Sequence, residues 1–322
     1  MQSFLDPAIL FFVFGLLAGA LKSNLEIPPQ IARFLSLYLL MALGLKGGFA
    51  LEKSGLTSEV SISLGCAVGL ALTVPMLGYM LLKRFVNGYD AAALAATYGS
   101  VSAVTFITTV QYLDGHSMHY GGHMAAAMAL MESPAIVMAV LLANLVRRQD
   151  PASQSKHHAP IGKILHESLT DGAQLLLLGA MLIGILTGDK GHDAMQPFTG
   201  DLFKGMLSFF LLDMGLAAAR NMAELRGKSP WILGYAIVGP MAHAALALLL
   251  CTVLGVSAGN GALLMVLAAS ASYIAVPAVV RHAIPEANPS LYIGMSLGLT
   301  FPFNILIGIP VYVGIAQWAL PA

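Results

Sequence analysis

Two apolar stretches with the same interruption decide the fold of this chain. Residues 91–110 read AAALAATYGSVSAVTFITTV, and residues 261–281 read GALLMVLAASASYIAVPAVVR. Each has about the 20 residues that a helix needs to cross a bilayer. Each also carries serines beside a glycine or a proline, residues that loosen a helix. Both stretches are therefore predicted to be membrane helices that are broken at membrane depth.

The composition supports a membrane protein along the whole chain. Of its 322 residues, 57% are hydrophobic and only 10% are charged, whereas soluble proteins have about 25% charged residues. The predicted class is an all-α integral membrane protein with about ten transmembrane helices. The apolar runs that define them cover residues 5–22, 31–51, 60–82, 91–110, 123–146, 170–188, 202–219, 231–254, 261–281 and 290–319. Pro302 and Pro310 predict a kink or break in the last run.

Several classes of function find no support in the sequence. The chain has 16 basic and 16 acidic residues, so its net charge gives no reason to expect nucleic acid as a partner. It has no Gly-Lys-Ser/Thr element, which argues against ATP-driven transport by this chain. The spans contain no His–Glu–x–x–His motif and no paired catalytic aspartates, so an enzyme is not expected. Cys66 and Cys251 lie in apolar runs and are read as small buried side chains.

The positions of Lys and Arg predict the orientation of the chain. With ten spans, most basic residues fall in loops on one side, and the other side holds only Lys46, Lys53, Lys190 and Lys204. The side rich in Lys and Arg is expected to face the cytoplasm. Both termini would then lie outside a multi-pass protein of the inner (plasma) membrane.

The two halves of the chain resemble each other. Asp90–Leu94 matches Asn260–Leu264, and Gly99–Ser102 matches Ala269–Ser272, at an offset of about 170 positions. The predicted domains are a first five-helix repeat at 1–146, a cytoplasmic linker at 147–168 and a second five-helix repeat at 169–322. Because five is an odd number of crossings, the second repeat would be inverted. Inverted repeats are typical of secondary transporters, which bind substrate where the repeats meet.

The two broken helices supply the main candidate site. A broken helix exposes N–H groups that hold an anion and carbonyl groups that hold a cation. The candidate residues for substrate or ion binding in these spans are Gly99, Ser100, Ser102, Thr105, Ser270, Ser272 and Tyr273. Ser102, Thr105 and Ser272 are the candidate Na⁺ ligands, with no other metal or cofactor expected. The alternative is that these small residues only let helices pack closely.

Other polar residues inside the spans are weaker candidates. Glu132 precedes Ser133-Pro134, where it could bind a coupling cation or brace a proline kink. Asn304 could supply a carbonyl ligand or bond a neighbouring helix. Lys46 and Asp213 hold neighbouring positions in the repeat and could pair, although Lys46 could equally reach the interface.

Three histidines, His116, His119 and His123, lie in and after a short loop. Their spacing would suit a metal on a helix, but Gly121-Gly122 interrupts the run. A solvated loop is therefore the favoured interpretation.

Several motifs resemble the sodium-dependent bicarbonate transporters of cyanobacteria and their broader bacterial relatives. These motifs are Leu43–Gly48, Gly99–Ser102, Glu132–Ala135, Leu165–Leu169 and Ile284–Gly294, and the resemblance covers nearly the whole chain in order. It implies a core and a gate domain, a homotrimer and Na⁺-coupled bicarbonate uptake. It also implies a regulatory partner of the PII type at the cytoplasmic face. The central linker of this chain is, however, shorter than the linker of the cyanobacterial members. Tyr273 stands where the cyanobacterial members carry an aspartate, which removes a candidate Na⁺ ligand.

The sequence therefore predicts a secondary transporter that takes up bicarbonate or a similar small anion with Na⁺ by alternating access. One alternative is a transporter of a different small organic or inorganic anion, which the Tyr273 difference favours. Another is a membrane sensor or scaffold that transports nothing.

Overall fold

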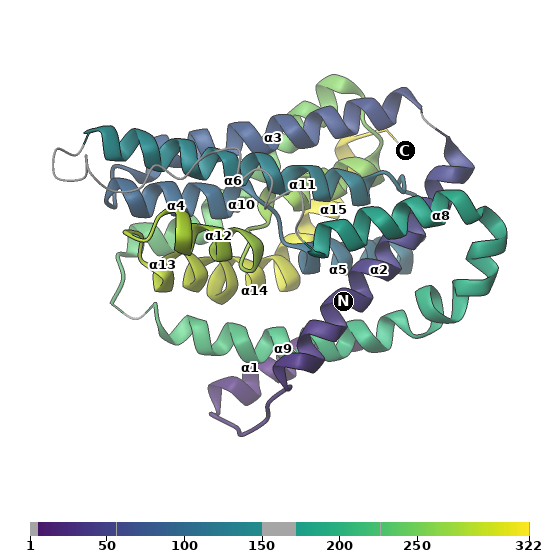
Figure 1. Ribbon diagram of the computed structural model, residues 1–322, viewed down its shortest axis with the longest axis horizontal. Helices are drawn as coiled ribbons and strands as arrows, with labels where there is room; N and C mark the ends of the chain where they lie inside the picture. Colours follow the sequence, from purple (N-terminus) through teal and green to yellow (C-terminus); the bar gives the residue numbers. More distant parts are fainter. Residues whose placement is uncertain (1–5, 56, 150–171, 226, 322) are drawn as a thin grey trace.

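The computed structural model describes residues 6–55, 57–149, 172–225 and 227–321, and all of its regular structure there is helical. Figure 1 shows the helices packed side by side, most of them along the long axis of the molecule. In chain order they are α1 (Pro7–Ala20), α2 (Pro29–Ser54), α3 (Ser58–Leu82), α4 (Gly88–Gly99), α5 (Ala103–Gly115), α6 (Met124–Gln149), α8 (Gly172–Gln196), η3 (Pro197–Asp201), α9 (Phe203–Ala223), α10 (Pro230–Leu254), α11 (Ala258–Ala269), α12 (Ala275–Ala283), α13 (Pro289–Ile293), η4 (Gly294–Thr300), α14 (Phe301–Phe303), η5 (Asn304–Gly308) and α15 (Ile309–Ala319). The predicted linker lies almost wholly outside the described residues.

Seven helical stretches in the described part of the chain are long and apolar enough to cross a membrane. One of them, Gly172–Ala223, is 52 residues long and contains both predicted spans 170–188 and 202–219. Gly188 has a φ of 53° inside α8, a backbone conformation open mainly to glycine. The chain then turns back through η3 into α9 (Figure 1). The architecture is that of an integral membrane protein.

The interruptions predicted for residues 91–110 and 261–281 are present. Helix α4 ends at Gly99, where a side chain would meet the ring of Pro75 from α3. Ser100 then continues in extended backbone with φ −93° and ψ −176°. Helix α11 ends in the same way before Ser270, which has φ −83° and ψ 169°. Each stretch is therefore two short helices joined by a few extended residues.

Helices α1, α2, α8 and α9 pack on one another through small residues. Gly15 of α1 lies against Gly215 of α9, so close that an added Cβ on either would meet the other helix's backbone. Gly44 and Gly48 of α2 lie in the same way against α8. Small residues allow such close approach in membrane proteins. These four helices form one layer, with α1 and α9 along the lower edge of Figure 1.

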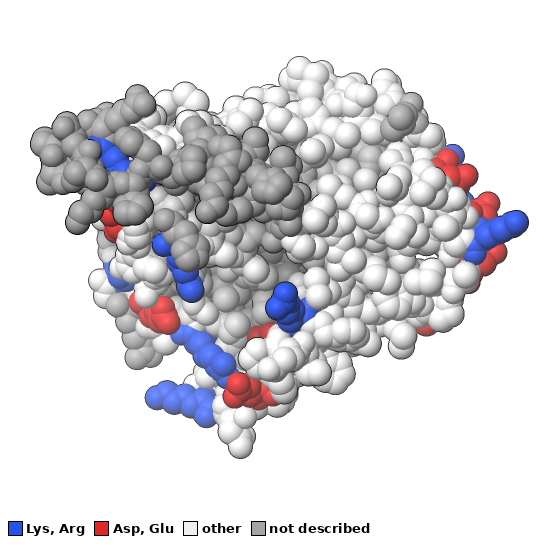
Figure 2. Space-filling model, in the orientation of Figure 1, with Lys and Arg blue, Asp and Glu red and all other residues white. Residues whose placement is uncertain are grey.

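The remaining helices form a second layer around α4 and α11, whose residues are almost all buried. Large apolar side chains are exposed on the outer helices, including α1, α3, α8 and α10. On the face shown in Figure 2, one group of charged side chains runs along the lower left to the middle of the molecule and another lies at the right end, with a broad uncharged surface between the two groups. Such a surface suits lipid contact.

The last predicted run keeps a helical path through its two prolines. The π-helical segments η4 and η5 flank Pro302, and α15 begins just before Pro310. Proline removes a backbone donor from the helix, and wider π turns accommodate such irregular positions. The predicted kink or break therefore takes the form of local π turns.

Candidate functional site

The two interrupted helices meet at their breaks. The backbone N–H of Ser102 donates a hydrogen bond of 3.0 Å to Oγ of Ser270. In the opposite direction, the N–H of Ser272 donates to the carbonyl oxygen of Thr97 at 2.8 Å. These bonds tie the α4–α5 break to the α11–α12 break. Residues that lie 168 and 175 positions apart in the chain are thus held together near the centre of the helical bundle.

Serines at equivalent positions bond the first turns of the helices that follow the two breaks: Ser102 is the N-cap of α5, and Ser272 lies two residues before Ile274, the N-cap of α12. Oγ of Ser102 accepts hydrogen bonds from the N–H of Thr105 at 3.2 Å and from its hydroxyl at 2.9 Å. The Ser102 hydroxyl in turn donates to the Tyr273 hydroxyl oxygen at 3.4 Å. Oγ of Ser272 accepts from the N–H of Val276 at 3.2 Å. The first N–H groups of a helix have no acceptor within the helix, so α5 and α12 both present a positive end here.

These two helix ends open into one cavity of about 260 Å³. Its polar lining consists of Ser36, Ser102, Glu132, Gln174, Ser272 and Tyr273, and the rest of the lining is mostly apolar. Gln174 Nε2 of α8 donates to Glu132 Oε2 of α6 at 2.6 Å. Among the described residues that line the cavity there is no Lys or Arg. Among the described residues, the groups of the cavity that favour an anion are the N-terminal backbone dipoles of α5 and α12.

Behind this cavity lies a second group of polar atoms. In the described part of the chain, the hydroxyl oxygens of Thr97 and Ser100 and the Oδ1 of Asn304 are buried without a hydrogen-bond partner. Asn304 Nδ2 donates to the carbonyl of Ala269, the last residue of α11, at 2.8 Å. These oxygens thus lie near the carbonyl ends of α4 and α11, which carry partial negative charge.

The predicted site residues divide into two groups. Ser102, Glu132, Ser272 and Tyr273 line the cavity. The other predicted residues lie outside the lining of the cavity. Gly99 packs on Pro75, and Thr105 and Ser270 form hydrogen bonds with Ser102. Ser100 and Asn304 are buried.

Sequence reasoning missed Ser36, Thr97 and Gln174. Gln174 stands alone as a polar residue in the otherwise apolar run 172–186, so an intramembrane polar residue of this kind could have been singled out. Ser36 and Thr97 give no comparable signal, because hydroxyl residues are common in membrane helices.

The weaker candidates have other partners. Lys46 pairs with Asp114 at 3.4 Å, and no ion pair between Lys46 and Asp213 occurs among the described residues. His123 is buried, whereas His116 and His119 are exposed. The described residues contain no group of three His, Cys, Asp or Glu side chains that could hold a metal.

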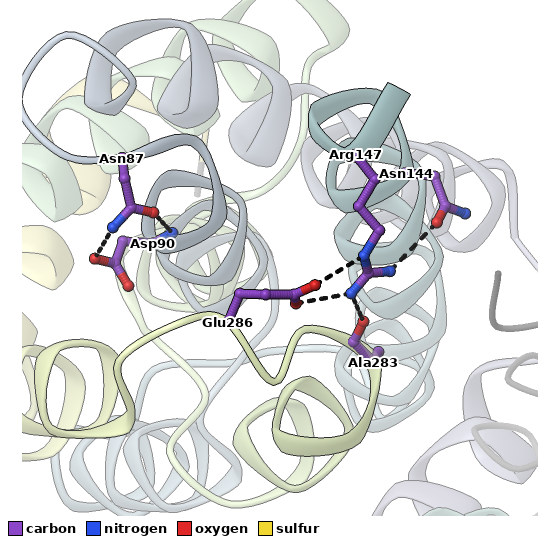
Figure 3. A network of polar contacts seen from close by, with 6 residues as sticks. All are labelled: Asn87, Asp90, Asn144, Arg147, Ala283 and Glu286. Atoms are coloured by element: carbon purple, nitrogen blue, oxygen red, sulfur yellow. Dashed lines mark hydrogen bonds and ion pairs between the residues drawn. The ribbon is translucent and has the colours of Figure 1, made fainter. Parts of the chain in front are cut away.

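A charged clamp holds the far end of α12 in place (Figure 3). Arg147, near the end of α6, bonds both carboxylate oxygens of Glu286 at 3.1 and 2.8 Å. The same guanidinium donates to the carbonyl of Ala283, the last residue of α12, at 2.8 Å. Arg147 is only 5% exposed. Burial raises the pKa of Glu286, but its hydrogen bond to Arg147 and the charge of Arg147 outweigh this and bring the pKa below its usual range.

Apolar spans around two interrupted helices that meet at their breaks, beside a small cavity with a few polar side chains, define the class as an integral membrane transporter. Comparison with protein families agrees, because the model for the Na+-dependent bicarbonate transporter superfamily matches residues 7–317. The chain belongs to this superfamily, which is a family of transporters and not of enzymes. No curated protein matches the chain significantly.

Proposed function

We propose that this protein is a secondary transporter that takes up bicarbonate, or a similar small monoanion, together with Na⁺. The observation that carries the proposal is the meeting of two helix N-termini, those of α5 and α12, in one cavity. Membership in the Na⁺-dependent bicarbonate transporter superfamily supports both the anion and the cation.

The anion is proposed to bind between the first turns of α5 and α12. Ser102 and Ser272 each accept a hydrogen bond from an N–H of the first turn of these helices, and both line the cavity. The N–H groups of Ala103 and Val104 belong to the first turn of α5, where no acceptor within the helix exists. A helix N-terminus with free N–H groups binds anions well. No Lys or Arg among the described lining residues competes for this role.

Na⁺ is proposed to bind close to the anion and to neutralise it. Two groups of oxygen atoms near the breaks could serve as Na⁺ ligands. One is the Glu132 carboxylate, which lines the cavity. The other is the buried oxygen atoms of Thr97, Ser100 and Asn304, which have no hydrogen-bond partner in the described structure. Hydroxyl, amide and carbonyl oxygens suit a hard cation. Ser102, Thr105 and Ser272 remain candidate ligands as well.

Transport is proposed to use alternating access between two inverted repeats with ten spans. Helices α4 and α11 each have 12 residues and begin 170 positions apart (258 − 88). Helix α1 packs on α9 as α8 packs on α2, which is the exchange of partners that a two-fold relation between the halves requires. The layer of α1, α2, α8 and α9 would be the gate domain, and the other helices the core domain.

The orientation proposed for this transporter follows the distribution of Lys and Arg, with both termini outside the inner (plasma) membrane. The central cavity is lined by residues from the N-terminal half of α2 and from the first turns of α8 and α12. These segments adjoin the end that carries the loop after α12 and the predicted linker, so the cavity would open toward the cytoplasm. The homotrimer and the PII-type partner are proposed from the family resemblance alone.

Uptake into proteoliposomes tests the proposal. Purified protein should accumulate radiolabelled bicarbonate under an inward Na⁺ gradient and not under a choline gradient. Ser272→Ala should reduce this uptake at least tenfold. If no accumulation occurs with either cation, bicarbonate symport is wrong.

Tyr273 favours a second candidate, a transporter of a different small anion. It lines the cavity with a phenol ring where cyanobacterial members carry an aspartate. A thermal-shift screen of small anions, with and without Na⁺, separates the two candidates by which anion gives the largest Na⁺-dependent rise in Tm. A sensor or scaffold would instead keep all of its phenotypes in Ser102→Ala and Ser272→Ala.

A further inference from the structure

A second cavity, of about 480 Å³, lies next to the central one along the same helices. Its walls are the later turns of α2 and α5, the first turn of α6 and the 117–122 loop. The central cavity is lined by the preceding turn of α2, the start of α5 and the following turn of α6. We call the second one the outer cavity, because it lies at the end of the molecule opposite to the loop after α12. The two cavities are therefore stacked along α2, α5 and α6.

A short apolar barrier separates the two cavities. Leu40 lines the central cavity and Leu43 the outer one, three residues further along α2. Met128 and Met124 are related in the same way on α6. Phe106 faces the outer cavity from α5. All five side chains are at most 6% exposed. The barrier thus spans about one helical turn, or about 5 Å.

The outer cavity contains a basic side chain, which the described lining of the central cavity does not. Lys46 of α2 points its Nζ at Asp114 Oδ2 of α5, 3.4 Å away, and lies 4.6 Å from the ring centre of Phe203. The side chains of Lys46 and Asp114 are 28% and 37% exposed. Water in the outer cavity therefore reaches this pair, and an ion pair this exposed is weak.

The pair joins the two layers of the molecule. Asp114 also accepts a hydrogen bond from the Tyr120 hydroxyl through its other oxygen, Oδ1, at 2.9 Å. Asp114 and Tyr120 belong to the same stretch of chain, whereas Lys46 belongs to α2 in the other layer. A movement of α2 away from α5 would leave Asp114 with Tyr120 and free Lys46 to take another anion.

From this arrangement we propose that the outer cavity is a second binding site for a small monoanion, with Lys46 as its positive group. The anion exchanges with Asp114 on Lys46 before it passes the apolar barrier to the central cavity. The identity of this anion as the transported substrate rests on the proposed function. The site itself rests on Lys46, Asp114 and the stacking of the two cavities.

Chemical labelling tests the site without any transport. Ala50 lines the outer cavity four residues after Lys46, a spacing that places both on one helix face. An Ala50→Cys variant is treated with anionic sulfonatoethyl methanethiosulfonate or with its cationic trimethylammonium analogue. The parent protein is the control, because Cys66 and Cys251 are buried.

With Lys46 present, the ratio of the anionic to the cationic reaction rate should be high, and sodium bicarbonate should slow the anionic reagent. Adding Lys46→Met should lower the ratio at least fivefold and abolish protection, because the local positive charge is gone. Adding Asp114→Asn should raise the ratio. If Lys46→Met leaves the ratio of anionic to cationic labelling rates unchanged, the proposal is wrong. Lys46→Arg is the control for a folded site and should label like the Ala50→Cys variant that retains Lys46.

Uptake assays then link the site to transport. Lys46→Met should raise the KM for the anion about tenfold with little change in the maximal rate, and Lys46→Arg should restore it. An unchanged KM would overturn the role of Lys46 in substrate capture. If wild-type protein takes up no bicarbonate, the proposed function fails, whereas the labelling ratios still decide the outer site.

Discussion

Ser102 and Ser272 hold equivalent places at the two breaks. Ser102 is the N-cap of α5, and Ser272 accepts a hydrogen bond from Val276 in the first turn of α12. Replacing a capping serine by alanine costs about 1 kcal/mol of stability. The larger effect is expected on transport, because the same hydroxyl groups line the central cavity. The hydrogen bonds to the helix N-termini and the proposed ligand binding thus involve the same side chains.

Ser102→Ala should therefore lower Tm by only a few degrees while reducing Na⁺-driven uptake at least tenfold. Ser63→Ala is the matched control, because Ser63 is fully buried in α3 and its hydroxyl has no partner in the described structure. It should leave uptake unchanged. Equal losses of uptake in the two variants would contradict the assignment of Ser102 to the binding site.

Glu132 is the carboxylate of the central cavity, and Gln174 orients it. Glu132→Gln keeps the size of the side chain but removes its charge. The Na⁺ concentration for half-maximal uptake should then rise at least tenfold, as measured in a Na⁺ titration of uptake. The control is Glu26→Gln at an exposed position. If the Na⁺ concentration for half-maximal uptake is unchanged, Glu132 is not a ligand of the transported Na⁺.

Among the helices, the sequence predicted which ones are interrupted. It did not predict the long-range contacts that hold the helical segments in place. Gly99 marks the end of α4, whereas Pro277, the proline of the second stretch, lies inside α12 just beyond the interruption. The partners of Arg147 lie 136 and 139 positions away, and no local pattern shows such contacts. The same holds for Lys46, whose pairing with Asp114 depends on the packing of α2 against α5.

The Arg147–Glu286 clamp should make stability depend on pH. The pKa of Glu286 is lower in the folded protein. Its contribution is therefore present above the unfolded carboxyl pKa of about 4.3, and it is lost as pH falls through the folded pKa. The difference in Tm between wild type and Glu286→Gln should be constant from about pH 5.5 to 8 and shrink below about pH 4.5. A difference that stays constant to lower pH would contradict the clamp.

The close packing of α2 on α8 at Gly48 can be tested by substitution. An alanine at Gly48 would place its Cβ on the backbone of α8 at Met181. Overpacking of this kind costs typically about 1–3 kcal/mol. Gly48→Ala should therefore lower Tm clearly. Gly65→Ala is the matched control, since a Cβ at Gly65 of α3 meets nothing within 4 Å, and it should leave Tm unchanged or raise it. Similar shifts in both would argue against close α2–α8 packing.

For the whole molecule, composition alone identified a membrane protein, and the motifs indicated the superfamily that the family comparison shows. The location of the cavities could not be predicted in the same way. They lie between α2, α5, α6, α8 and α12, so they depend on how two layers meet. The stacking of an outer and a central cavity along shared helices is a property of the assembled fold.

The central claim is that a small anion binds between the N-termini of α5 and α12 in the presence of Na⁺. The most direct measurement is an experimental density map of the protein with saturating sodium bicarbonate, compared with choline bicarbonate. With sodium bicarbonate, we expect anion density within hydrogen-bonding distance of Ser102 and Ser272. With choline bicarbonate, we expect none there. Anion density at another place, or equal density with both cations, would contradict it.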